Sequence, residues 1–295
     1  MSLESRFRSS EHMARFLAAY QNMLALWPVT PEALDIQTDY GVTHLNVVGS
    51  PQRPPLIMLH GAQVSSPGWY RNIEPLSQHF RVYAVDVIDQ AGRSAPTRKL
   101  KTAEDCATWL IGLLDALEIP QAAFIGHSQG GWQTLNLAIR HPDRVARMVL
   151  LSPGGSFSPM GLKLLFGMLP IFVRPTRSNF YRGFKSLTTA PATPDQPNPV
   201  IETFMTAALS YKPNQLTLGV VSVFSDEELQ QVTIPTLLLV GSEEIIYRYG
   251  NTRVIERAKK LMPNINAVLV QGGRHLFPVD QAEAVNAQML AFLIQ

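Results

Sequence analysis

Short apolar segments alternate with amphipathic segments along most of this 295-residue chain. The apolar segments are rich in Val, Leu and Ile, which is typical of strands buried on both faces of a sheet. The segments between them carry apolar residues at helical spacing. This alternation predicts an α/β fold with a mostly parallel central sheet and helices on both faces. The predicted strands fall in residues 54–61, 80–87, 122–126, 145–153, 234–241 and 266–273, and the predicted helices in residues 102–119, 130–142, 251–263 and 281–295.

The N-terminal part of the chain lies outside this alternation. Residues 9–28 have apolar residues at helical spacing, and we expect Ser10 to cap this helix and Pro28 to end it. Residues 34–49 predict a hairpin that turns near Tyr40-Gly41.

A second interruption occupies residues 154–231, which contain two helical segments and a proline-rich patch but no strand pattern. An excursion of this length from one sheet edge is too long for a plain loop, so we expect it to fold as a helical cap. The predicted organisation is a core formed by residues 1–153 and 232–295, with the cap inserted at residues 154–231.

The composition excludes several classes of function. The formal net charge is only +2 and the basic residues form no stripe, so we expect no nucleic-acid partner. The single Cys106 excludes an internal disulfide and a multi-cysteine metal site, and we expect it to be buried within a helix.

No segment predicts a targeting signal or a membrane span. The first ten residues lead into no apolar signal core. The longest apolar stretch, residues 164–173, is too short to cross a bilayer and is interrupted by Gly167 and Pro170. We therefore expect a cytoplasmic protein without a membrane span, and the sequence predicts no particular oligomeric state.

Ser128 occupies the centre of Gly126-His127-Ser128-Gln129-Gly130, between a predicted strand and a predicted helix. A residue that leaves a strand, turns sharply and enters a helix needs small neighbours two positions away. This pattern in this context is the nucleophile elbow of serine hydrolases, which exposes the hydroxyl beside the N-terminus of a helix. We expect Ser128 to be a nucleophile.

A serine nucleophile needs a base, and the base needs a carboxylate. Of the seven histidines, His275 follows the last predicted strand in a loop opened by two glycines. Loops at the C-terminal ends of parallel strands share one edge, so His275 is the predicted base. Glu243 and Glu244 follow the preceding strand, and the residues alone leave both open as the acid.

Attack on an ester carbonyl also requires preorganised N–H donors for the oxyanion. The backbone N–H of Gln129, directly after the nucleophile, is one predicted donor. The second is expected from the loop after residues 54–61, where Ala62 is the candidate and Gln63 the alternative. Asp86 and Asp89 lie outside the triad order, and we expect them to be structural.

Over nearly its whole length the chain resembles the cap-bearing, esterase-like branch of the α/β-hydrolase superfamily. The motifs that carry the resemblance are "HGA", "DVIDQAGRS", "GHSQGG", "GSEEIIY" and "GGRHLFPVDQAEAVN". Members commonly place the acid three residues after a strand-end glycine, and this register selects Glu244 over Glu243. The usual acid is Asp, and the Glu found here resembles a bacterial carboxylesterase-like group.

Together these features predict a serine hydrolase that cleaves small to medium apolar carboxylic esters through an acyl-enzyme, with no metal or organic cofactor. Residues 164–173, Phe204, Met205 and Phe224 suggest an apolar pocket for such a small-molecule ester. Two alternatives stay open: a C–C bond hydrolase that uses the same triad, and a ligand-sensing signalling protein that retains the hydrolase pocket.

Overall fold

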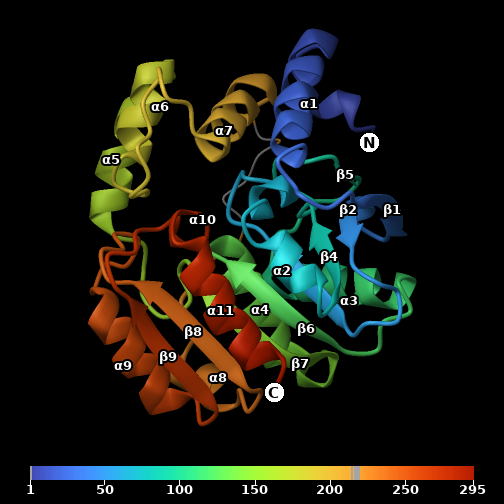
Figure 1. The fold of residues 1–295 in the computed structure, drawn as a ribbon, viewed down its shortest axis with the longest axis vertical. Helices are drawn as coiled ribbons and strands as arrows, with labels where there is room; N and C mark the ends of the chain where they lie inside the picture. The colour runs from blue at the N-terminus through green and yellow to red at the C-terminus, as the bar shows by residue number, and fades with distance from the viewer. Residues whose placement is uncertain (1, 214, 216–219) are drawn as a thin grey trace.

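The computed structural model describes residues 2–213, 215 and 220–295. Within these residues, nine strands form one sheet in the order β1-β2-β4-β3-β6-β7-β8-β9, and β5 pairs with β2 (Figure 1). Neighbours from β4 to β9 in this order are parallel, whereas β2 pairs antiparallel with β1, β4 and β5. The strands are β1 (Glu32–Thr38), β2 (Gly41–Val48), β3 (Pro55–Leu59), β4 (Arg81–Val85), β5 (Ala95–Pro96), β6 (Ala122–His127), β7 (Val145–Leu151), β8 (Thr236–Gly241) and β9 (Ile265–Val270).

Helices cover both faces of this sheet, which confirms the predicted α/β fold. The helices are α1 (Ser10–Leu24), α2 (Ile73–Ser77), α3 (Ala103–Ala116), α4 (Gln129–Arg140), α5 (Leu162–Val173), α6 (Arg177–Phe184), α7 (Pro199–Ser210), α8 (Asp226–Gln230), α9 (Asn251–Leu261), α10 (Phe277–Asp280) and α11 (Ala282–Leu293). Helices α3, α4 and α9 pack into one apolar core, and α2 and α11 into another. Along β6, Ala122 and Phe124 belong to the first core and Ala123 and Ile125 to the second, which is the period of two expected of a strand.

The N-terminal predictions hold with two corrections. Helix α1 ends at Leu24, with Ala25 as its C-cap, and so stops before Pro28. Helix α1 begins as expected, but its N-cap is Ser9 and not Ser10: the extended Ser9 accepts a hydrogen bond from the His12 N–H at 3.3 Å. The hairpin forms, with Thr38 of β1 opposite Gly41 of β2.

Helices α5, α6 and α7 lie between β7 and β8 in the sequence, and in Figure 1 they lie beyond α10, away from the sheet. Helix α7 packs against α1, and α5 packs against α6. These helices share one apolar core, which contains Phe180, Phe184, Ile201 and also Leu276. The sequence predicted helices at α5 and α7 but not at α6.

Gly167 and Pro170 interrupt the apolar run of this stretch but not the helix: α5 continues through both residues. Pro170 lies in the last turn of the helix, where it removes only one backbone hydrogen bond. Among the described residues, no helix combines the length and apolar character needed to cross a bilayer.

Cys106 is buried in α3, as expected, and burial raises the pKa of its thiol to about 12. The thiol is therefore protonated at neutral pH and packs as a small apolar side chain.

Candidate active site

Ser128 lies in a sharp turn between β6 and α4. Its backbone has φ 52° and ψ −114°, a conformation that residues other than glycine rarely adopt. A Cβ atom at Gly126 would lie 2.3 Å from the Gly130 carbonyl oxygen, and one at Gly130 would lie 2.1 Å from that of Leu59. Both distances are too short for carbon and oxygen, so only glycine at these positions permits the elbow.

The loops after β6, β8 and β9 bring three chemically relevant residues to the same edge of the sheet. Ser128 follows β6, Glu244 lies in the loop after β8, and His275 in the loop after β9. His275 Nδ1 lies 2.8 Å from Glu244 Oε2. Because a carboxylate accepts hydrogen bonds, this contact places the imidazole hydrogen on Nδ1 and leaves Nε2 with its lone pair.

Glu244 is held ionised in a buried position. Its Oε1 atom accepts hydrogen bonds from the backbone N–H groups of Ile245 at 2.8 Å and Ile246 at 3.1 Å. Burial alone raises the pKa of Glu244, but neighbouring His275 and these hydrogen bonds outweigh it and hold the pKa below the ordinary 4.5.

Glu243, the competing acid, lies in a different environment. Its side chain is 53% exposed and pairs with Arg274 at 3.1 Å. The geometry therefore brings Glu244, and not Glu243, to His275.

His127 makes a contact that sequence reasoning did not foresee. Its Nε2 atom lies 2.9 Å from the main-chain oxygen of His275, and the two rings lie 4.8 Å apart. Burial lowers the pKa of His127 to about 3, so the ring is neutral and its Nε2–H donates to the carbonyl. The residue before Ser128 thus ties the elbow to the loop that carries His275, and only the tertiary structure reveals it.

The loop after β3 lies against the elbow. A Cβ atom at Gly61 would lie 3.4 Å from Ser128 Cβ. The next residues are Ala62 and Gln63, the two candidates for the second oxyanion donor. The N–H of Gln63 already donates to the side-chain oxygen of Gln90 at 3.2 Å, which favours Ala62.

Two other buried groups maintain this loop region. His60 donates from Nδ1 to the Gly61 carbonyl at 2.8 Å and accepts at Nε2 from the Val87 N–H at 3.1 Å. The Asp86 carboxylate accepts hydrogen bonds from the N–H groups of Ser66 at 2.8 Å and Arg93 at 2.7 Å. These contacts are those of structural residues, which is the role expected for Asp86.

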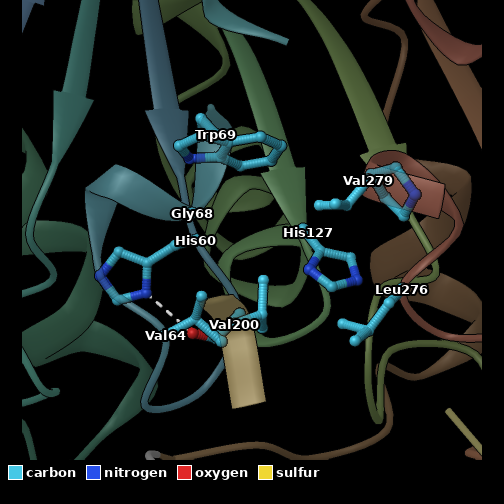
Figure 2. Close-up of a pocket in the computed structure, with 10 residues that line it drawn as sticks. His60, Val64, Gly68, Trp69, His127, Val200, Leu276 and Val279 are labelled. Carbon is cyan, nitrogen blue, oxygen red and sulfur yellow. Dashed lines mark hydrogen bonds between the residues drawn. The ribbon is translucent and has the colours of Figure 1, made fainter. Parts of the chain in front are cut away.

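A pocket of about 30 Å³ borders the elbow (Figure 2). Its walls include Trp69, Gly61, His127 and Leu276. His127 directly precedes Ser128, and Leu276 directly follows His275. The other lining residues are mostly apolar: His60, Val64, Gly68, Val200, Pro278 and Val279. Across residues 2–213, 215 and 220–295, no three His, Cys, Asp or Glu side chains form a group that could hold a metal ion.

The chain is similar to known hydrolases over nearly its whole length. The sequence model of the alpha/beta hydrolase fold family matches residues 54–282. Carboxylesterase YbfK of Bacillus subtilis (strain 168) is 33% identical over 98% of this chain and 96% of its own length. The crystal structure of naproxen esterase (carboxylesterase NP) from Bacillus subtilis is 32% identical and covers 96% of this chain and 98% of that one, with a TM-score of 0.87.

A shorter match joins the chain to 2-hydroxymuconate semialdehyde hydrolase of Pseudomonas sp. (strain CF600), which is 37% identical over 42% of this chain and 45% of its own length. The match of the family model and the near full-length similarity to YbfK have one consequence: the chain belongs to the α/β-hydrolase fold family.

Proposed function

We propose that this hydrolase is a carboxylesterase that cleaves small to medium apolar carboxylic esters through an acyl-enzyme. The observation that carries the proposal is the 2.8 Å contact between His275 and the buried Glu244, at the sheet edge where Ser128 leaves β6. The near full-length similarity to a relative named as a carboxylesterase supports ester substrates.

In the proposed mechanism, Ser128 Oγ attacks the ester carbonyl while His275 Nε2 takes its proton. Glu244 keeps the imidazole in the tautomer that accepts this proton and stabilises the imidazolium that forms. His275 then protonates the leaving alcohol. In the second half of the reaction it activates a water molecule, which releases the acid and restores Ser128.

The oxyanion that forms in each half-reaction rests on two backbone N–H groups, those of Gln129 and Ala62. Gln129 is the first residue of α4, so the positive end of the helix dipole adds to the stabilisation. The engagement of the Gln63 N–H by Gln90 supports the choice of Ala62.

We also propose that residues 154–231 act as a cap over the candidate active site and select the substrate. Val200 of α7 lines the pocket beside the elbow, and the Leu276 N–H donates to the Leu187 carbonyl at 2.7 Å, which joins the segment to the His275 loop. The pocket of about 30 Å³ has room for about two water-sized groups, which favours a short apolar substituent on one side of the ester.

A series of nitrophenyl esters from acetate to octanoate tests this function. We expect kcat/KM to be highest for the short acyl chains and to fall by roughly tenfold or more toward octanoate. Trp69→Ala should enlarge the pocket and move the optimum to longer chains. Preference for charged or sugar esters would contradict the proposed substrate class, and no turnover of any ester would contradict the esterase itself.

The partial match to 2-hydroxymuconate semialdehyde hydrolase favours C–C bond hydrolysis as the second candidate, because the same serine, histidine and acid serve both reactions. The two functions are separated by assaying one preparation on a nitrophenyl ester and on a vinylogous diketone. Faster cleavage of the diketone would replace the esterase proposal.

A further inference from the structure

The outward side of α5 exposes a row of large apolar side chains, which we call the α5 apolar face. Its members are Leu162 (50% exposed), Leu165 (55%), Phe166 (70%), Leu169 (50%), Phe172 (75%) and Val173 (77%). They recur at steps of three and four residues and so share one side of the helix. The opposite side packs inward through Leu164, Met168 and Ile171.

This arrangement differs from the pocket that the sequence suggested for the stretch, because most of its apolar side chains point to solvent. Large contiguous exposed apolar patches are uncommon on monomeric proteins, and the largest patch is often an interaction site. In Figure 1, α5 lies at the outer left of the molecule with α6 beside it.

The segment around this face is also basic. Residues 144–194 contain no Asp or Glu. Lys163, Arg174, Arg182 and Lys185 are all exposed in this segment. The whole chain has a net charge of only +2, so the positive charge is concentrated here.

A groove of about 660 Å³ lies beside the α5 apolar face, between α5, α6 and the loop after β8. Lys163, Arg182 and Lys185 line it together with Phe166. Glu243 also lines the groove, but it is paired with Arg274, so cations outnumber acids there. Apolar surface next to several cations matches a molecule that has an acyl chain and an anionic head group.

We infer that the α5 apolar face docks on a membrane surface that contains anionic lipids. The apolar row would enter the boundary between head groups and acyl chains, while Lys163, Arg182 and Lys185 contact the head groups. At 12 residues, α5 is too short to cross the bilayer and lies in its surface. This inference concerns binding alone and does not depend on the proposed function.

The charge distribution favours a lipid surface over a second copy of this chain. A two-fold symmetric interface brings the same patch of both copies together. Residues 144–194 contain no acid, and the one acid of the groove, Glu243, is already paired with Arg274, so two such basic patches would repel each other.

Docking at this face would hold the candidate active site near the membrane. The N–H of Gly161, the residue before α5, donates to the Ile246 carbonyl at 2.6 Å. The N–H of the same Ile246 donates to Glu244. The start of α5 is therefore joined to the segment that carries Glu244.

Co-sedimentation of the full chain with vesicles tests the inference. Vesicles of phosphatidylcholine mixed with phosphatidylglycerol should bind the protein, vesicles of phosphatidylcholine alone should bind it much more weakly, and added salt should weaken binding. The double variant Phe166→Gln/Phe172→Gln should lower the partition coefficient by about tenfold or more. The triple variant Lys163→Gln/Arg182→Gln/Lys185→Gln should lower it by about fivefold for each charge removed.

Ile294→Gln is the matched control, because Ile294 is a 56% exposed apolar residue at the C-terminal end of the chain, and it should leave vesicle binding unchanged. Circular dichroism and thermal melting verify that each variant is folded. Absence of binding to the anionic vesicles would overturn the inference, as would equal binding by folded wild type and Phe166→Gln/Phe172→Gln. A different result would assign the face to a second copy of the chain. In that case the wild type would sediment as a dimer and would not bind vesicles, and Phe166→Gln/Phe172→Gln would sediment as a monomer.

Discussion

The sheet edge around Glu244 and the outward side of α5 differ in whether the rest of the protein supplies partners for their side chains. At the edge, the Glu244 carboxylate is buried and accepts hydrogen bonds from His275, Ile245 and Ile246. On α5, Phe166 and Phe172 are 70% and 75% exposed. Because all of these hydrogen-bond partners of Glu244 belong to the folded chain, folding alone determines the position of its carboxylate. An apolar face that folding leaves uncovered is available for contact with something else.

In this comparison of the two regions, the largest expected effect separates two neighbouring acids at the sheet edge. Glu244→Gln should lower kcat/KM on nitrophenyl acetate by about 10³-fold or more, because the amide cannot stabilise the imidazolium. Glu243→Gln removes only an exposed ion pair with Arg274 and should change kcat/KM by less than about threefold. Equal losses of kcat/KM in the two variants would contradict the assignment of Glu244, and not Glu243, as the partner of His275.

An intermediate effect concerns pH. Burial holds the pKa of His127 at about 3 in the folded protein, against an ordinary value of 6.5, and also lowers that of His60. The unfolded chain therefore binds a proton at each of these positions before the folded protein does, so the free energy of unfolding should fall as pH decreases below 6.5. For His127 the fall continues toward pH 3 and is at most about 1.4 kcal/mol per pH unit, and His60 contributes in the same direction.

Urea unfolding between about pH 5 and 6.5 measures this slope above the range in which carboxylates titrate. His127→Gln should flatten the slope. If wild type and His127→Gln lose stability equally across this range, His127 is not the buried neutral group that ties the His275 loop to the elbow.

The smallest effect is expected on the outward side of α5. Phe172→Ala should change the free energy of unfolding by less than about 0.5 kcal/mol, because this ring is exposed. Phe180 of α6 is fully buried, and Phe180→Ala should cost about 3–5 kcal/mol. A loss of comparable size for Phe172→Ala in urea unfolding would mean that its ring is packed and that the two regions do not differ.

Much of the sheet edge could be predicted because its signals are local in the sequence. Gly126 and Gly130 flank Ser128 in a strand–turn–helix pattern, and the structure has both glycines at positions where a Cβ atom would clash. His275 follows β9, which pairs parallel with β8 and so ends at the same edge of the sheet as β6 and β8.

Other features depend on contacts between distant segments and have no local signal. The hydrogen bond from His127 to the His275 carbonyl joins residues that are far apart in the sequence. The choice between Ala62 and Gln63 depends on Gln90, which lies in another loop. On α5 nearly every residue is apolar, so the spacing cannot show which side of the helix faces the core.

The most direct test of the central claim is fluorophosphonate labelling of the purified protein, with mass mapping of the adduct and a nitrophenyl acetate assay on the same sample. We expect a single adduct on Ser128, rapid ester turnover, and a loss of about 10⁴-fold or more in turnover for Ser128→Ala, which should take up no label. An adduct at another residue, or ester turnover that survives in Ser128→Ala, would contradict the role of Ser128 as the nucleophile.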